Sequence, residues 1–313
     1  MALQTSGAIS LANIQTEFGG SNPISISEYY GAAAGVPTSG AIAIGHFYGK
    51  SSQFTFTIST NQTNANLATL ATAAGWDGSS NLQATINSGV YISSNSTGTP
   101  ALTVSGSYPA GVTLINNGYI VGMGGSGAKG SARIQNNSAT PYSGSSGGGA
   151  LSVSSAITIQ NNGTIGGGGG GGGAGGLALM FNNDNDPIST ATGGGGGGGR
   201  GGSTNSSGGA RGEYWYPCYT GYGSAGGSGT SSGAGAGGSG GYASYQGQVC
   251  AGGNGGSGGN WGSSGGGGGA GYKISGFTLY RINPSSGGGA GYAVSGNGNI
   301  TWSATGTRLG AIS

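Results

Sequence analysis

The side chains of this sequence that could carry chemistry lie in four short segments between long runs of glycine. The segments are 181–187, 211–222, 242–250 and 272–284, and they combine Tyr, Trp, Asn and Asp with few charges. Tyr and Trp provide large amphipathic contact area at low entropic cost, so such segments are typical of recognition surfaces. The chemistry they indicate is binding, with these candidate contact residues: Phe181, Asp184, Asp186, Arg211, Tyr214, Trp215, Tyr216, Tyr219, Tyr222, Tyr242, Tyr245, Tyr272 and Tyr280.

The sequence offers little material for an active site. It contains one histidine, His46, together with two cysteines and six acidic residues. General acid–base catalysis needs positioned titratable groups, and a zinc site needs three or four ligands. The run 183–186 lacks the spaced carboxylates of a calcium loop, and the Gly-x-Gly-x-x-Gly match at 122–127 precedes no helical pattern. We therefore expect no enzyme, no cofactor and no metal site.

Charge and hydropathy exclude two further classes of protein. The formal net charge is only +2, whereas a protein that tracks nucleic-acid phosphates needs clustered Lys and Arg. No stretch approaches eighteen consecutive apolar residues, so we expect no membrane insertion. Cys218 and Cys250 are compatible with one disulfide, if the protein works outside a cell, or with two thiols, and the sequence leaves both open.

Glycine makes up 81 of the 313 residues and is concentrated in a few tracts. Collagen is excluded because there is no Gly-X-Y period, and an isolated α-helix is excluded because Gly costs about 1 kcal/mol per position relative to Ala. The polyproline II conformation remains, with three residues per turn and no internal hydrogen bonds. Bare glycine helices can lie side by side and donate N–H groups to neighbouring carbonyls. We predict a polyglycine II bundle with loops at its ends, built from tracts 166–176, 193–202, 223–241, 252–271 and 287–291.

The N-terminal fifty residues contain an internal repeat, because TSGAI at 5–9 recurs at 38–42. Ser10 is a predicted N-cap of a short helix that ends at Gly19. A segment of this size is too small for a robust core of its own, so we expect an anchor at 1–52 that completes its burial against a partner. Its candidate attachment residues are Leu11, Ile14, Phe18, Ile24, Ile26, Tyr29, Tyr30, Phe47 and Tyr48.

Alternating and helical patterns follow the anchor. Residues 53–59 alternate aromatic and polar side chains as a strand does, residues 82–93 and 101–104 predict further strands, and residues 64–74 predict a helix after cap candidates Asn61 and Thr63. Asn-Asn-Gly stands between β-prone stretches in 112–122 and again in 157–166, which predicts two hairpins. The predicted fold is mainly β and irregular: an anchor at 1–52, a β-rich spacer at 53–140 and a polyglycine II domain with distal loops at 141–313.

Two parts of the sequence resemble proteins of tailed phages. Residues 6–11 and 17–30 (SGAISL and EFGGSNPISISEYY) resemble the start of virion structural proteins, notably in phages of cyanobacteria. The run 161–168 (NNGTIGGG) and the alternating glycine tracts resemble the distal tail-fibre adhesins of T-even-like phages. In that family a polyglycine II sandwich carries distal loops that choose the host receptor, which implies this role for the four aromatic segments. T-even-like adhesins do not begin with this N-terminal motif, so attachment to a fibre tip and attachment to a baseplate both stay open.

The sequence thus predicts a non-catalytic receptor-binding protein in the virion tail, at a fibre tip or tail tip. Its expected partners are other tail-fibre or baseplate proteins, a trimeric fibre among them, and a bacterial outer-membrane protein or polysaccharide as receptor. Two alternatives stay open. One is a purely structural fibre or baseplate component. The more remote one is a polyglycine II ice-binding protein, which Thr and small residues spaced regularly on one face would favour.

Overall fold

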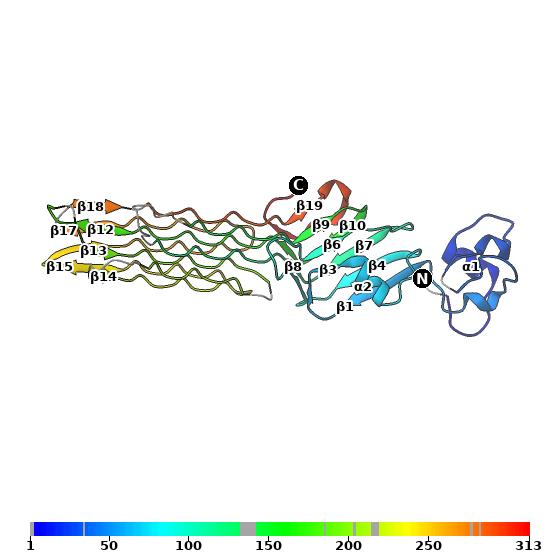
Figure 1. Ribbon diagram of the computed structural model, residues 1–313. Helices are drawn as coiled ribbons and strands as arrows, with labels where there is room; N and C mark the ends of the chain where they lie inside the picture. The colour runs from blue at the N-terminus through cyan, green and yellow to red at the C-terminus, as the bar shows by residue number, and fades with distance from the viewer. Residues whose placement is uncertain are drawn as a thin grey trace.

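The chain forms an elongated molecule of three parts in the computed structural model, which describes residues 3–33, 35–131, 142–184, 186–202, 205–213, 219–275, 278–281 and 283–313. A small N-terminal unit lies at one end, a stack of parallel strands follows, and a bundle of glycine tracts extends to short strands at the far end (Figure 1). Strands and irregular segments dominate, and the described residues contain two α-helices. The predicted fold class is therefore confirmed.

The N-terminal unit is built around α1 (Leu11–Phe18), η1 (Ile26–Tyr29) and η2 (Ile44–Phe47). The Ser10 hydroxyl accepts a hydrogen bond from the Asn13 N–H, and Gly19 ends α1 with a φ of 76°, both as the sequence predicts. Ile14, Tyr29 and Phe47 are 0%, 3% and 0% exposed within the unit. The expectation that a partner completes this burial is wrong for these three, because they belong to one core cluster of the unit. In that cluster the rings of Phe18, Tyr29 and Phe47 meet at 6.0–6.4 Å.

The sequence repeat explains how so small a unit closes. The Gly31 N–H donates to the Pro37 carbonyl at 2.9 Å, and the Gly49 N–H donates to the Gln4 carbonyl at 3.1 Å. Each Tyr-Gly turn thus holds the residue that directly precedes one TSGAI copy. The hydroxyl groups of the tyrosines that follow η1 and η2 repeat the pattern. Tyr30 donates to the Gly40 carbonyl, and Tyr48 donates to the Gly7 carbonyl. Because the last turn binds the first copy, the unit is tied end to end.

The central part is a parallel β-helix with three sheets. The chain visits the sheets in turn and adds one strand to each on its first four circuits, and a fifth circuit adds a strand to the first two sheets. All neighbouring strands are parallel. The first sheet contains β1 (Gln53–Ile58), β4 (Asn81–Ile86), β7 (Val112–Asn116), β10 (Ile157–Asn161) and β20 (Ile300–Ala304). The second contains β2 (Gln62–Thr63), β5 (Tyr91–Ser93), β8 (Tyr119–Val121), β11 (Thr164–Gly166) and β21 (Thr307–Leu309). The third contains β3 (Ala65–Asn66), β6 (Leu102–Val104), β9 (Leu151–Val153) and β19 (Val294–Ser295).

Alternation along each strand places apolar side chains inside the β-helix. In β4 and β7, Leu82, Ile86 and Leu114 are fully buried, whereas the residues between them are half-buried on the outer face. The helix α2 (Leu67–Ala73) follows β3 and inserts Leu67 into the same core. Its N-cap is Asn66, whose Oδ1 accepts the Thr69 N–H at 3.1 Å, rather than Asn61 or Thr63, because the helix starts only after β2 and β3.

The two Asn-Asn-Gly segments are corners of the β-helix, and the hairpin prediction is wrong. β7 pairs with β4 and β10, while β8 pairs with β5 and β11, so the strands on either side of the corner belong to different sheets. The corners stack on one another: the buried Asn116 side chain donates from Nδ2 to Asn161 Oδ1 at 2.8 Å. Asn161 in turn donates to the Thr305 carbonyl at 2.8 Å. The Asn-Gly signal thus marks a turn, but between two sheets.

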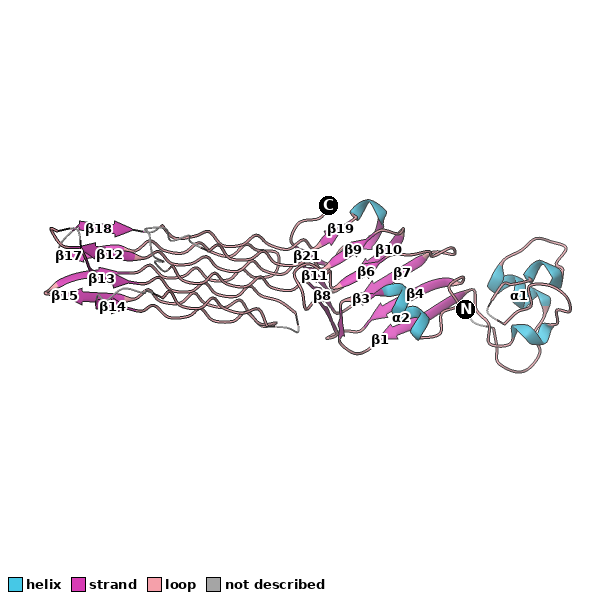
Figure 2. Cartoon of the chain, in the orientation of Figure 1, coloured by secondary structure: helices cyan, strands magenta, loops and turns pink. Residues whose placement is uncertain are grey.

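The glycine tracts are two excursions from one corner of the β-helix. They occupy 122–150, between β8 and β9, and 167–293, between β11 and β19. A single division at residue 140 therefore does not separate spacer from glycine domain, because β9, β10, β11, β19, β20 and β21 all belong to the β-helix. Figure 2 shows the tracts as long loops lying side by side, with short strands only at the far end.

Hydrogen bonds between the tracts repeat every third residue. In the tract after β11, the N–H groups of Gly168, Gly169 and Gly170 donate at 2.8–3.0 Å to three different neighbouring tracts. Those of Gly171, Gly172 and Gly173 return to the same three tracts at 2.7–2.9 Å. Their acceptor carbonyls are, in order, Gly148, Arg200, Ser263, Ser145, Gly197 and Gly266. This is the period that three residues per turn require, as the polyglycine II prediction states.

Position in the bundle explains the composition of each tract. The uninterrupted runs 166–173 and 193–199 are buried, with neighbouring tracts on all sides. A peripheral tract instead carries Asn254, Ser257 and Asn260, which are exposed at every third position. Side chains therefore occur where the three-residue period points to solvent, and bare glycine occurs where it points to another backbone.

Candidate functional site

The far end of the bundle carries two small antiparallel sheets that are made from the aromatic segments. One contains β12 (Ala178–Phe181), β13 (Pro187–Ala191), β14 (Tyr219–Gly221) and β18 (Thr278–Arg281), with β14 added in parallel. The other contains β15 (Tyr242–Tyr245), β16 (Gln248–Ala251) and β17 (Tyr272–Ser275). Segments up to a hundred residues apart in sequence thus meet at the end opposite the N-terminal unit (Figure 1).

Small side chains hold the two sheets together. Ala178, Met180 and Ala191 of the first sheet pack against Ala243 and Cys250 of the second in one buried cluster. Cys250 is fully buried, and its Sγ lies 3.6 Å from the Ser189 hydroxyl. The aromatic side chains of these strands take no part in this cluster and lie outside it.

Tyrosines dominate that outside. The exposed fractions are 61% for Tyr219 and Tyr242, 51% for Tyr272, 49% for Tyr222 and 41% for Tyr280. An aromatic ring exposed to this degree gives contact area that a partner can bury. The structure therefore brings candidate residues from three of the four predicted segments onto one end of the molecule, and Phe181 of the remaining segment joins them.

Contacts among the aromatic residues fix several of the rings. The Tyr219 ring centroid lies 5.0 Å from that of Tyr245, and Phe181 meets Tyr280 edge to face at 6.5 Å. The Arg211 guanidinium lies 4.9 Å from the Tyr222 ring centroid. Rings restrained in this way lose less rotamer entropy on binding than free ones do. Tyr214, Trp215, Tyr216 and Cys218 lie outside the described residues, as does any pairing of Cys218 with Cys250.

The acidic segment at the end of β12 forms an ordered turn. Asn182 Oδ1 accepts hydrogen bonds from the N–H groups of Asp184 at 3.0 Å and Asp186 at 2.7 Å. Both aspartates are exposed. Among the described residues no three His, Cys, Asp or Glu side chains are grouped as a metal site would require. The side chain that organises the turn is thus the asparagine.

Sequence reasoning missed the turn between β15 and β16. Gln246 and Gly247 have φ values of 47° and 76°, the left-handed pair of a type I′ hairpin. The signal was a Gln-Gly pair between two Tyr-containing β-prone stretches, and Gln seldom occupies the first of these positions. Tyr142 and Ile274, exposed at 56% and 51%, were also missed as surface apolar residues.

At the opposite end, the predicted attachment residues divide into core and surface. Ile14, Tyr29 and Phe47 form the core of the N-terminal unit, and Leu11, Phe18, Ile24 and Ile26 pack partly buried against it. Tyr30 and Tyr48 are the exposed members, at 36% and 37%, and Ile44, which was not among the predicted residues, is exposed at 37%. His46 Nδ1 accepts the Ala43 N–H at 3.0 Å, so this histidine caps η2.

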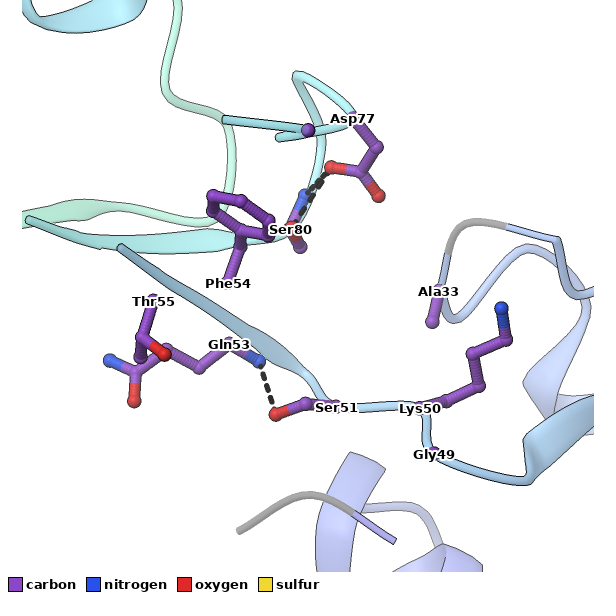
Figure 3. Close-up of a pocket in the computed structure, with 10 residues that line it drawn as sticks. Ala33, Gly49, Lys50, Ser51, Gln53, Phe54, Thr55, Asp77 and Ser80 are labelled. Atoms are coloured by element: carbon purple, nitrogen blue, oxygen red, sulfur yellow. Dashed lines mark hydrogen bonds between the residues drawn. The ribbon is translucent and has the colours of Figure 1, made fainter. Parts of the chain in front are cut away.

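A pocket of about 320 Å³ lies between residues of the N-terminal unit and residues of the β-helix. Lys50 and Ala33 line it from one side, and Gln53, Phe54 and Asp77 from the other (Figure 3). The Asp77 carboxylate accepts hydrogen bonds from the N–H groups of Ser79 and Ser80 at 2.9 and 2.8 Å. Burial by itself raises the pKa of Asp77, but the hydrogen bonds from Ser79 and Ser80 outweigh it and lower the pKa to about 2. The carboxylate is thus engaged within its own turn, and the pocket marks a boundary between two units.

Comparisons with known proteins agree with the geometry. A family model described as phage tail fibre adhesin Gp38 matches residues 53–313. The crystal structure of the gp37–gp38 adhesin tip complex of the bacteriophage S16 long tail fibre has the same fold, with a TM-score of 0.54 and 21% identity over 96% of this chain and 92% of that chain. A comparison with curated protein sequences gives no match. None of the described helices is long and apolar enough to cross a membrane. The family match begins where the N-terminal unit ends.

Proposed function

Because the chain belongs to the Gp38 family of phage tail fibre adhesins, a component of the virion tail, we propose that its distal tyrosines bind the bacterial receptor. We call these residues the distal surface: Tyr219, Tyr222, Tyr242, Tyr245, Tyr272 and Tyr280. The observation that carries the proposal is the exposure of five of these six rings, all but the half-buried Tyr245, at the end farthest from the N-terminal unit. The receptor is an outer-membrane protein or a polysaccharide.

The bundle supports this role mechanically. Its tracts are joined along their length by backbone hydrogen bonds of 2.7–3.3 Å, and both excursions are rooted in the β-helix. At the root, the Arg200 guanidinium lies 3.6 Å from the Trp261 ring, and that ring lies 6.0 Å from Tyr119. A rigid stalk of low charge presents the distal surface without adding interactions of its own.

The N-terminal unit is the proposed site of docking to another tail protein. Its exposed apolar residues, Tyr30, Ile44 and Tyr48, lie on the turns that repeat within the unit. The similar structure of phage S16 is a complex of two tail-fibre proteins, which supports a partner of that kind here. A fibre tip and a baseplate protein are both compatible with the unit.

The ice-binding alternative would be favoured by regular rows of threonines on one face of the molecule. On the outer face of the first sheet, Thr55, Thr113, Thr158 and Thr301 fall in one register row, but Gln83 interrupts it. In the adjacent row, Thr57 and Thr85 are followed by Ile115 and Gln160 and then by Ala304 of the last strand. Regular hydroxyl spacing is therefore lost in both rows, and the family match favours the adhesin.

Binding of the full-length protein to host cells tests the proposal. Replacing Tyr219, Tyr242 and Tyr272 together by Ala should reduce cell binding at least tenfold in a pull-down assay. The matched control replaces Thr55, Thr57 and Thr301 by Ala, which are also exposed but lie on the β-helix. Undiminished binding by the tyrosine variant would leave a purely structural tail component as the better interpretation.

A further inference from the structure

The outer face of the sheet β15–β16–β17 carries two tyrosines on either side of an alanine. Tyr242 is in register with Ala251, and Ala251 is in register with Tyr272. Residues directly opposite one another across neighbouring strands project from the same face of a sheet. The two phenol side chains therefore form a pair of walls, and the Ala251 methyl group is the floor between them.

Burial shows that these walls face solvent. Ala243 and Cys250, one residue along β15 and β16, are 4% and 0% exposed and point into the layer between the two sheets. The alternate residues must point outward, and Tyr242 and Tyr272 are indeed 61% and 51% exposed. A buried floor between two exposed rings defines a slot that opens away from the molecule.

The width of the slot sets what can enter. Neighbouring strands lie about 4.8 Å apart, so walls two strands apart stand about 9–10 Å from each other. A ring that packs between two faces needs about 3.5–4 Å on each side. One ring therefore fits between the tyrosines, and a second does not.

The lining favours a sugar ring. The lining is uncharged: it consists of Tyr242, Ala251 and Tyr272. The next pair on the same face of β15 and β16, Ser244 and Val249, is uncharged as well. An aromatic face is electron-rich, and it attracts the C–H bonds of a pyranose because the ring oxygens polarise them. The phenol groups and the exposed Ser244 hydroxyl stand at the edge, where a sugar carries its own hydroxyl groups.

We infer that this slot binds one neutral pyranose unit of a bacterial surface polysaccharide. The inference rests on the proposed receptor-binding function and names the chemical class of its ligand. Tyr242 and Tyr272 pack on the two faces of the sugar, Ala251 admits it, and Ser244 bonds one of its hydroxyl groups.

Titration calorimetry of the full-length protein tests the slot. The probe is the oligosaccharide released from the lipopolysaccharide of a bacterium to which the wild-type protein binds. Tyr242→Ala, Tyr272→Ala and Ala251→Leu, which fills the floor and keeps both walls, should each weaken binding at least tenfold. Tyr272→Phe should retain binding within threefold because the ring remains. The matched control is Tyr142→Ala, a tyrosine of comparable exposure (56%) outside both the slot and the distal surface, and it should leave binding unchanged.

The outcomes separate the slot from the adhesin function. Loss of cell binding after periodate oxidation of the cells, together with the calorimetric losses, supports the inference. If Ala251→Leu folds by circular dichroism and still binds the oligosaccharide and cells like wild type, the slot is refuted while the adhesin stands. Loss of cell binding after protease treatment but not after periodate points to a protein receptor and also overturns it. A wild-type protein that binds no cells of any host refutes the proposed function itself.

Discussion

At the scale of single residues, the buried glycines are required by contact rather than by backbone conformation. A Cβ on Gly170 would stand 2.0 Å from the Gly288 carbonyl oxygen, and one on Gly168 would stand 1.8 Å from that of Met123. Neither glycine has the left-handed φ that disfavours a side chain. The obstacle is the neighbouring backbone, which is hydrogen-bonded and cannot retreat.

Gly170→Ala should therefore destabilise the protein. Overpacking of this kind costs about 1–3 kcal/mol, and the clash with backbone places this change at the upper end. Gly267 is the matched control, because its Cβ would meet nothing closer than the Ser285 carbonyl oxygen at 3.7 Å. Alanine at that peripheral position should be neutral, or stabilising by up to about 1 kcal/mol through the unfolded chain. Thermal unfolding of both variants measures the difference, and equal melting temperatures would contradict the hydrogen-bonded packing described here.

Asp77 gives a prediction that depends on pH. Its pKa is lowered from 3.8 to about 2 in the folded chain, so the folded state favours the ionised carboxylate. The resulting stabilisation is present above pH 4 and is lost as the pH falls toward 2. Asp77→Asn should thus lower the free energy of unfolding at pH 7 and have little effect near pH 2, as measured by urea titration. A deficit that is the same at both pH values would show that the charge is not involved.

At the scale of elements, the corner asparagines carry the stacking of the β-helix. Asn161 is buried and bonds both Asn116 and the Thr305 carbonyl, whereas the adjacent Asn162 is exposed and bonds the side chain of Asn117 at 2.9 Å. Removing a buried partner leaves other buried polar groups unsatisfied, at about 1–3 kcal/mol. Exposed amides exchange such bonds for water at little cost.

Asn161→Ala should therefore lower the free energy of unfolding by about 2 kcal/mol or more. Asn162→Ala, with the same change one residue away, should cost less than about 0.5 kcal/mol. Chemical denaturation of the two variants provides the measurement. Comparable losses in both would indicate that the ladder is not a buried, cooperative feature of the corner.

These elements also show how far the sequence could be read. Ser10 and Gly19 bound α1 as predicted, because capping is a local interaction that the sequence displays directly. For Asn116 and Asn161 the sequence predicts hairpins, because a turn signal does not reveal whether the next strand folds back or enters another sheet. Whether a hairpin or a corner forms depends on which strands pair with β7 and β8, and these are β4 and β5 earlier in the chain. The alternation of apolar and polar residues in those strands is the same for a hairpin and for a corner.

The distal surface was predictable in composition but not in arrangement. Tyr219, Tyr242 and Tyr272 stood out as recognition residues, since aromatic side chains between glycine tracts have few core positions to fill. Their registers across β14, β15, β16 and β17 were hidden, because each strand has only three or four residues. The slot around Ala251 could not be found from sequence, since an alanine becomes informative only when both of its neighbours across the sheet are known.

At the scale of the whole molecule, the fold separates two surfaces by the length of the bundle. The exposed Tyr30 and Tyr48 lie on the N-terminal unit, and the distal surface lies at the other end (Figure 1). The β-helix joins them, because its first strand follows the N-terminal unit directly and its corner roots both glycine excursions. Contacts made at one end thus leave the other end free, which is the arrangement that an adhesin carried by a virion requires.

This separation predicts two opposite phenotypes. Phage carrying Tyr30→Ala with Tyr48→Ala should lose the protein from purified virions, as judged by immunoblot, while the isolated variant still binds host cells. Phage carrying Tyr242→Ala with Tyr272→Ala should retain the protein at wild-type amounts and adsorb at least tenfold more slowly. An antibody against the glycine bundle, imaged on intact particles, locates the protein in both cases. If the first variant assembles normally, the docking site lies elsewhere than on the repeated turns. If both variants lose assembly and binding together, the two ends are coupled, and the rigid two-ended arrangement argued from the fold cannot be how the molecule works.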